Sequence, residues 1–127
     1  MKAFQLFIIV LSISGLLGCN SDNTSLEVTA TAYTSNPNET DDNPCLTAWG
    51  DTIQPGMKVI AVSRDLIRMG LSHKTRVTIE GLSGEYVVLD KMNKRWTKKI
   101  DIYMGLDKKK AKNWGKRKVV IHWSKKS

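Results

Sequence analysis

The sequence predicts a mostly β fold, a small closed barrel of about six short strands with one or two short helices. Three observations lead to this prediction. The chain has 127 residues, which is enough for one domain. Short segments with the apolar pattern of strands recur along it, separated by turns rich in Gly, Asn, Asp and Ser. Only two segments carry the start and stop signals of helices, and both are short.

The strands are expected where apolar residues alternate with polar ones or form short runs. Residues 26–33 alternate, which is typical of a strand with one buried face. In residues 100–104, three apolar residues share one face, so Asp101 and Tyr103 should point away from the core. The other expected strands are residues 59–62, 76–80, 85–89 and 118–123.

The two expected helices are recognised by their ends. Ser63 is a suitable N-cap for a helical turn over residues 64–68, which Gly70 would close. Asp107 is the expected N-cap of a second helix that runs to about residue 114 and ends before a Gly. These two segments complete the prediction of a β-rich barrel.

The N-terminal segment, residues 1–18, has the pattern of an export signal. Lys2 supplies a positive start, and the apolar run that follows (LFIIVL) is too short to span a bilayer as a permanent helix. The segment leads into Leu-Leu-Gly-Cys at residues 16–19, which resembles the lipobox of bacterial lipoproteins. That resemblance implies cleavage before Cys19, which becomes the lipidated N-terminus, with an ordinary secretory signal as the alternative.

These expectations divide the chain into a signal peptide over residues 1–18, a polar tether over residues 19–26 and a barrel domain over residues 27–124. They place the mature protein in the cell envelope, anchored through lipid on Cys19 and expected at the outer membrane, facing the periplasm. Cys45 would then lack an intramolecular partner, and we expect a small, mostly buried thiol there rather than a nucleophile. No pair of Cys or His residues has metal-ligand spacing, so neither a metal nor another cofactor is expected.

Charge is distributed unevenly along the chain. Residues 19–90 carry 5 Lys/Arg and 10 Asp/Glu, whereas residues 91–127 carry 14 Lys/Arg and 2 Asp. A basic C-terminal third suggests a polyanionic neighbour such as envelope glycans, lipid headgroups or anionic wall polymers, and a solvated face is the alternative. Because the chain is expected outside the cytoplasm, nucleic acid is not an expected partner. We expect a monomer.

Six sequence fragments, taken in order, resemble the three-aspartate (3D) domain over residues 28–123. They are V-T-A-T-A-Y from residue 28, C-L-T-A-W-G from residue 45, I-A-V from residue 60, a strand that ends in Asp90, I-D-I-Y-M-G from residue 100, and A-x-x-W-G from residue 111 before a final β-run. The 3D domain is a double-psi β-barrel found in membrane-bound lytic transglycosylase A and in small cell-wall enzymes of spore-formers. Related barrels occur in rare lipoprotein A and in expansins. The resemblance implies a six-stranded double-psi β-barrel that acts on peptidoglycan glycan strands.

Two of the three aspartates of the 3D domain have a counterpart in this sequence. The third, which looks like the catalytic acid of the transglycosylases, matches Asp101, and the second matches Asp90, eleven positions earlier. The position of the first is Ser63, with Asp65 two residues further on. The Gly-rich stretch that follows the second aspartate in typical members is replaced by residues 91–96, K-M-N-K-R-W.

The resemblance implies a reaction that needs only one carboxylic acid. A lytic transglycosylase protonates the glycosidic oxygen with that acid, which then accepts a proton from the 6-hydroxyl of the sugar as this hydroxyl attacks the anomeric carbon. A second carboxylate nearby, here Asp90, would raise the pKa of Asp101 and keep it protonated. The alternative is a structural role, in which Asp90 accepts backbone N–H groups and Asp101 pairs with Lys99 or Arg95.

Four further residues are expected to contact substrate: Asn93, Arg95, Trp96 and Tyr103. Aromatic rings stack on sugars, while amide and guanidinium groups hydrogen-bond to N-acetyl, hydroxyl and carboxylate groups. The alternative is that Trp96 fills the core and Arg95 is a solvated charge. The remaining tryptophans are assigned to core and rim packing, and no role is assigned to His122.

Two classes of function remain open at this point. One is an enzyme, a lytic transglycosylase or glycosidase that cleaves peptidoglycan with Asp101 as general acid and base. The other is a barrel that binds peptidoglycan or another polysaccharide without cleaving it. Retention of Asp90 and Asp101 favours the first, and the loss of the first aspartate and of the Gly-rich stretch favours the second. The deciding observation is whether the two carboxylates converge in an open cleft.

Overall fold

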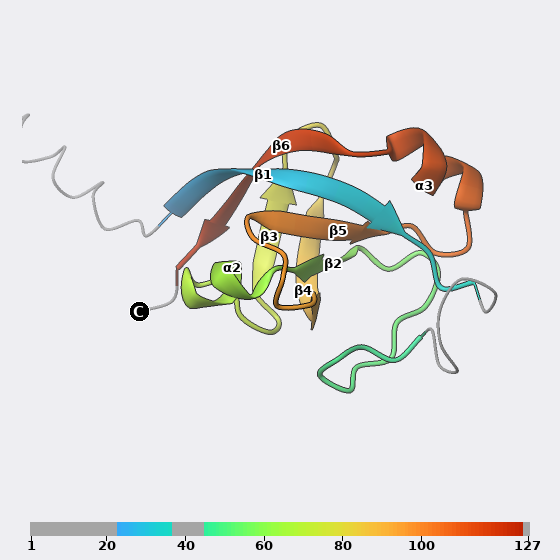
Figure 1. Ribbon diagram of the computed structural model, residues 1–127, viewed down its shortest axis with the longest axis horizontal. Helices are drawn as coiled ribbons and strands as arrows, with labels where there is room; N and C mark the ends of the chain where they lie inside the picture. Colours follow the sequence, from blue (N-terminus) through green and yellow to red (C-terminus); the bar gives the residue numbers. More distant parts are fainter. Residues whose placement is uncertain (1–22, 37–44, 126–127) are drawn as a thin grey trace, which may run out of the picture.

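A computed structural model describes residues 23–36 and 45–125 (Figure 1). In this part of the chain, six strands form a closed barrel in the order β1-β5-β2-β4-β3-β6. The elements are β1 (Asn23–Tyr33), β2 (Val59–Val62), α2 (Arg64–Arg68), β3 (Arg76–Ile79), β4 (Glu85–Lys91), β5 (Lys99–Tyr103), α3 (Lys108–Trp114) and β6 (Arg117–Ser124). The predicted fold class, a mostly β barrel with two short helices, is confirmed. The predicted signal peptide and Cys19 lie outside the described residues.

The order of strands around the barrel differs from their order in the sequence. β1 is parallel to β5 and β2 is parallel to β4, whereas the other four pairings are antiparallel. Strands that are parallel or that are not neighbours cannot be joined by tight hairpins. Longer connections are therefore needed, such as residues 92–98 between β4 and β5. These connections add loops outside the barrel wall, where they shape the surface.

The first and last strands of the domain close the barrel against each other. β1 and β6 pair from Asn23 with Ser124 to Ala30 with Arg117. β1 therefore starts within the segment predicted as a polar tether, because β6 supplies backbone partners for residues 23–26. Because residues 23–25 are all polar, the hydrophobicity pattern did not predict this part of the strand.

The main core fills the barrel interior and follows the predicted alternation. In β5, Ile100 and Ile102 are buried inside, so Asp101 between them points outward as predicted. Other fully buried side chains of this cluster come from the inner faces of the strands, and from α2 and the connection after it: Val28, Ala30, Ile60, Val62, Val77, Ile79, Val88 and Ile121 in strands, Leu66 in α2 and Leu71 after it.

A second apolar cluster lies on the outer face of the wall. Ile53, Val59, Leu89 and Tyr103 form it, and all four are at most 8% exposed. Ile53 belongs to the segment of residues 45–57, so this segment covers part of the outer face of the strands. β2 is consequently buried on both faces, and its pattern is a continuous apolar run rather than an alternation.

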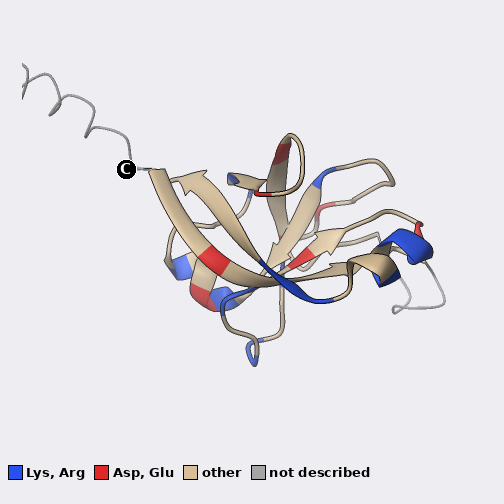
Figure 2. Ribbon diagram, turned by 90° about the horizontal axis from the view of Figure 1, so that it is seen from above, with Lys and Arg blue, Asp and Glu red and all other residues tan. Residues whose placement is uncertain are grey.

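The two helices cover opposite parts of the barrel (Figure 1). α2 places Leu66 in the main core, and Ser63 precedes it with the extended backbone of the predicted N-cap, although its side chain makes no capping hydrogen bond. In α3 the side chain of Asp107 accepts a hydrogen bond from the backbone N–H of Lys110 at 2.9 Å, so its predicted capping role is confirmed. Figure 2 shows that α3 is rich in basic residues. Within the described residues, no helix is long and apolar enough to cross a membrane.

Candidate functional site

Two aspartates flank one small residue on the outer face of the barrel. Ala61 in β2 is paired with Asp90 of β4 on one side and with Asp101 of β5 on the other. A register shift between Ile60 and Ala61 brings Asp90, rather than its neighbour, opposite Ala61. Because neighbouring strands lie about 4.8 Å apart, the two carboxylates stand at the same level with only a methyl group between them. This outer surface of β1, β5, β2 and β4, with Thr31 beside Asp101, is here called the aspartate face.

Asp101 is half-buried and held by β1. The Thr31 hydroxyl donates a hydrogen bond to Asp101 Oδ1 at 3.0 Å. Burial raises the pKa of Asp101 above its ordinary value, and the negative charge of Asp90 adds to this effect. The Thr31 hydrogen bond and the positive charge of Lys99 lower the same pKa, but burial outweighs them. The pKa of Asp101 is thus shifted in the direction that a general acid requires.

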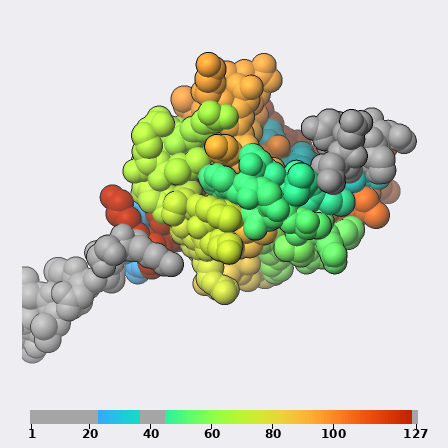
Figure 3. Space-filling view, turned by 90° about the horizontal axis from the view of Figure 1, so that it is seen from below, coloured from blue at the N-terminus to red at the C-terminus, as the bar shows by residue number. Residues whose placement is uncertain are grey.

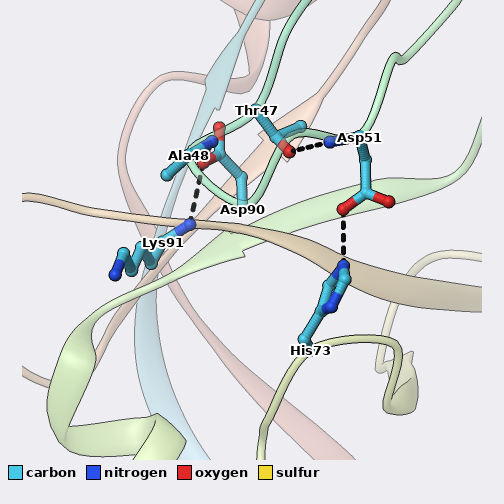
Figure 4. Close-up of polar contacts among 6 residues, drawn as sticks. All are labelled: Thr47, Ala48, Asp51, His73, Asp90 and Lys91. Carbon is cyan, nitrogen blue, oxygen red and sulfur yellow. Dashed lines mark hydrogen bonds and ion pairs between the residues drawn. The ribbon is translucent and has the colours of Figure 1, made fainter.

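Asp90 is tied to the backbone of two segments (Figure 4). Its Oδ1 accepts hydrogen bonds from the N–H of Ala48 at 2.8 Å and from its own neighbour Lys91 at 2.9 Å. Burial raises the pKa of Asp90 and the charge of Asp51 adds to it, while the two backbone hydrogen bonds lower it. The structural role considered for Asp90, accepting backbone N–H groups, is therefore present. Its proximity to Asp101 adds an electrostatic role to the structural one.

Tyr33, in β1, is a member of the site that the sequence did not single out. Its hydroxyl is buried and has no hydrogen-bond partner among the described residues. Burial raises its pKa far above the ordinary value, and the charges of Asp90 and Asp101 both raise it further. The hydroxyl therefore stands near both carboxylates as an unused donor. The only sequence signal was its place on the polar face of the predicted strand 26–33.

Tyr103 does not have the role that was expected for it. Its side chain is 3% exposed, its ring packs against Tyr33 with 5.4 Å between centroids, and its hydroxyl is hydrogen-bonded to that of Ser35 at 2.7 Å. A ring buried in this way is not accessible to a sugar. The expectation that Tyr103 contacts substrate directly is corrected: Tyr103 supports Tyr33 from within the second apolar cluster.

The segment of residues 45–57 covers the aspartate face beside Asp90 (Figure 3). Leu46 and Thr52 form an isolated antiparallel bridge, so the chain between them turns back on itself. The Thr47 hydroxyl accepts the N–H of Asp51 at 3.0 Å, which tightens this turn. Asp51 in turn pairs with His73, which lies between α2 and β3 (Figure 4). This chain of contacts holds Ala48 where its N–H reaches Asp90.

His73 and Asp51 were missed by sequence reasoning because they are 22 residues apart and neither belongs to a motif. Trp49, assigned to packing, lies against the His73 ring with 4.8 Å between centroids and also packs against the main core. Cys45, expected to be mostly buried, is a free and half-buried thiol at the start of the same segment.

Trp96 lies in the connection before β5, apart from both cores. It is half-buried, yet it neither belongs to nor packs against either apolar cluster. Lys99 Nζ lies 3.5 Å from the centroid of its ring, and the guanidinium carbon of Arg95 lies 4.8 Å from it. The alternative that Trp96 fills the core is wrong. Since Lys99 also lowers the pKa of Asp101, it connects the tryptophan with the aspartate face.

Hydrogen bonds fix the rest of the connection between β4 and β5. Asn93 is exposed, and its side-chain oxygen accepts the N–H of Arg95 at 3.0 Å. The hydroxyl of Ser63 accepts the N–H of Lys99 at 3.0 Å, and Asp65 Oδ2 accepts the N–H of Lys98 at 2.9 Å. Burial raises the pKa of Asp65, but its hydrogen bonds outweigh this and hold it below the ordinary value. Ser63 and Asp65 therefore anchor the start of β5.

Two hollows of the surface lie away from the aspartates. One hollow of about 560 Å³ lies beside His122 and Arg76, and another of about 490 Å³ lies beside Lys58 and Tyr86. Neither carboxylate lines either of them. Asp90 and Asp101 therefore stand at one level of a half-buried sheet face, and neither hollow is the open cleft that would favour catalysis. Among the described residues, no three His, Cys, Asp or Glu side chains gather as a metal site would require.

Comparison with known proteins bears on this arrangement. No protein-family model and no curated relative matches the chain. Two crystal structures of an expansin from Clavibacter michiganensis resemble it. The apo form has a TM-score of 0.53 at 16% identity and covers 82% of this chain and 52% of the expansin. A point mutant in complex with cellohexaose has a TM-score of 0.53 at 15% identity and covers 81% of this chain and 51% of the expansin.

The chain folds as a double-psi β-barrel. At this level of identity the likeness shows the fold alone. This double-psi β-barrel spans about half the length of the expansins that it matches. The roles of its aspartates therefore rest on the geometry described above.

The raised pKa of Asp101 makes a prediction about stability and pH. A carboxyl with a folded-state pKa above its unfolded value destabilises the fold once pH exceeds both values, and this penalty disappears below the ordinary pKa of 3.8. Asp101→Asn, which keeps an acceptor for Thr31, should therefore unfold at higher denaturant than the wild type at pH 7. The difference should shrink to zero as pH falls below about 4.

Urea unfolding of both proteins, followed between pH 3 and 8, measures this difference. Asp107→Asn is the matched control, because Asn caps a helix as well as Asp and should change stability little at any pH. A loss of stability in Asp101→Asn at pH 7 would contradict the burial argument.

Proposed function

We propose that this barrel binds a cell-wall polysaccharide, the glycan strands of peptidoglycan, along the aspartate face and the adjoining Trp96. The observation that carries the proposal is the position of Trp96. A large, half-buried ring that packs against neither apolar cluster and is flanked by Lys99 and Arg95 has no core-packing role in the described part of the barrel. Trp rings that remain accessible in this way commonly contact ligands.

The groups around Trp96 suit an amino-sugar polymer. The ring offers an apolar surface for one face of a sugar, and Lys99 and Arg95 supply positive charge for carboxylate and N-acetyl oxygens. Thr31 adds a hydroxyl group beside Asp101. A few directed polar groups around an apolar surface are typical of binding sites for sugars and other small ligands.

Two resemblances support a polysaccharide as the ligand class. One of the expansin structures that share the fold is a complex with cellohexaose, a polysaccharide fragment. The six fragments that resemble the 3D domain point to the same class, and to peptidoglycan as the polymer. Because this chain spans only about half of those expansins, their whole activity is not transferred to it.

Cleavage of the glycan strand is a second candidate function, favoured by the environment of Asp101. Burial and the neighbouring Asp90 raise its pKa, which is the condition for a carboxylic acid to donate a proton at neutral pH. In a lytic transglycosylase, Asp101 would protonate the glycosidic oxygen and then take the proton of the 6-hydroxyl as that oxygen bonds to the anomeric carbon.

We also propose that the mature protein is a lipoprotein of the cell envelope, held at the outer membrane through Cys19. The support is the sequence of residues 16–19 and the apolar run before it. Lipid on Cys19 would place the barrel directly beside the wall polymer.

Loss of the Trp96 ring should weaken binding to peptidoglycan. Trp96→Ala should bind purified sacculi about thirtyfold more weakly in a pelleting assay, because truncating a central tryptophan commonly costs about 2 kcal/mol or more. Trp96→Phe should recover part of the loss. Leu106→Ala removes another exposed apolar side chain and serves as the control, which should bind like the wild type. Unchanged binding of a folded Trp96→Ala would refute the proposal.

Loss of the acid tests cleavage separately from binding. Asp101→Asn should lower the rate of glycan cleavage by roughly a hundred- to ten-thousand-fold, as expected for the loss of a general acid. Asp90→Asn should cost less, because Asp90 acts on Asp101 through its charge. Mass spectrometry of the muropeptides distinguishes 1,6-anhydro ends from the reducing ends of hydrolysis. If the wild type binds sacculi and releases no product, the barrel is a binding module and the catalytic proposal fails.

Removal of the lipidated residue tests the anchor. Cys19→Ala should move the protein from the membrane fraction to the soluble fraction without unfolding it, since Cys19 precedes the first strand of the barrel. Fractionation followed by blotting measures this change, and Cys45→Ala is the matched control. Full retention of Cys19→Ala in membranes would exclude the lipid anchor.

A further inference from the structure

α3 and the start of β6 form a dense patch of positive charge, here called the α3 basic surface. Residues 108–118 contain seven Lys/Arg and no Asp or Glu. All seven side chains are exposed: Lys108, Lys109, Lys110, Lys112, Lys116, Arg117 and Lys118. Figure 2 shows the helix as a basic segment at one end of the barrel.

Several of these lysines lie at positions where positive charge destabilises a helix. Three consecutive lysines, residues 108–110, form its first turn, where there is no acidic residue. The free N–H groups of that turn have a partial positive charge, so acidic side chains stabilise it and lysines destabilise it. Lys108 and Lys112 also form a like-charge pair four residues apart, which is unfavourable. A sequence that breaks local rules in one place commonly does so for a function.

Contacts of Trp114 and Arg117 hold α3 against the barrel. Trp114 donates a hydrogen bond from Nε1 to the carbonyl of Ala30 at 3.2 Å. The Arg117 guanidinium carbon lies 4.0 Å from the centroid of the Trp114 ring, and Arg117 Nε donates to the Trp114 carbonyl at 3.1 Å. Within the described residues, Lys109, Lys110 and Lys112 take part in no ion pair. Their charges are therefore presented on a fixed helix and remain available.

The α3 basic surface lies at the end of the barrel away from the start of β1 and the end of β6 (Figure 1). β1 begins at Asn23, which pairs with Ser124, whereas α3 leads into Arg117, which pairs with Ala30. Seven residues of strand, at about 3.3 Å each, separate these two ends by about 23 Å. The chain that carries Cys19 joins the barrel at the far end. A membrane that holds Cys19 would thus lie away from the lysines.

We propose that the α3 basic surface binds the carboxylates of the peptide stems of peptidoglycan, as a second contact separate from the aspartate face. This inference rests on the proposed function, since it adds a second component of the same polymer. Lys ammonium groups bind carboxylates as point charges and need no fixed geometry, which suits flexible peptides. Once one contact has formed, the second site is held close to the same polymer at a high effective concentration, so two weak contacts together bind more tightly than either alone.

The experiment compares sacculi before and after conversion of their carboxylates to neutral amides. The double variant Lys109→Gln and Lys110→Gln should bind untreated sacculi about tenfold more weakly than the wild type. Amidation should weaken the wild type to a similar degree and leave the variant nearly unchanged. The control is Lys74→Gln with Lys125→Gln, which removes the same charge from other exposed positions and should bind like the wild type.

A second pair of variants separates binding from a structural role. Lys109→Glu with Lys110→Glu should raise the melting temperature, because acidic residues suit the first turn of a helix, while binding to sacculi falls. Binding and stability moving in opposite directions would support the proposal. Wild-type binding by the Gln variant, or an equal effect of amidation on both proteins, would overturn it.

Two further measurements identify the source of any failure. If the Gln variant binds vesicles of anionic phospholipid more weakly than the wild type does but binds sacculi normally, the proposal is overturned in favour of lipid headgroups. If Trp96→Ala binds sacculi normally while the Gln variant does not, the proposed function of the aspartate face fails and the α3 basic surface stands.

Discussion

The site depends on the placement of β2, a strand of four residues that is buried on both faces. Its inner face contributes to the main core, and its outer face carries Ala61 between the two aspartates. The register shift at Ile60 and Ala61 is what brings Asp90 level with Asp101. Without it, Leu89 would face Ala61 and the carboxylate would lie one residue away along the strand. A local irregularity in one strand pair thus sets the spacing of the two charged groups.

The arrangement of Asp90, Asp101 and Tyr33 lowers the stability of the fold. Asp90 and Asp101 are carboxylates removed from much of the solvent, and Tyr33 has a buried hydroxyl without a partner in the described residues. Each of these features lowers stability, since a buried polar group is favourable only when it is fully hydrogen-bonded. The second apolar cluster below them, with Tyr103 and Ile53, offsets part of this loss. Groups that lower stability beside a well-packed core are typical of functional sites.

The sequence predicted those features that depend on local pattern. The alternation in residues 100–104 placed Asp101 on the outer face, and the caps at Ser63 and Asp107 placed both helices. It did not predict the pair of Asp51 and His73 or the fold of residues 45–57 over β4, because these contacts join segments that are distant in sequence. Burial of Tyr103 was missed for the same reason. An outward-facing residue is exposed only if no other segment covers it.

The pairing of β1 with β6 has a consequence for how the chain becomes folded. Six residues of β1, from Asn23 to Val28, pair with no strand other than β6, the last strand of the barrel to be synthesised. Until β6 is present, this edge of β1 is open, and the entropy of closing a loop over nearly the whole domain has not yet been lost. The barrel therefore closes late, after residues 117–124 have been added to the chain.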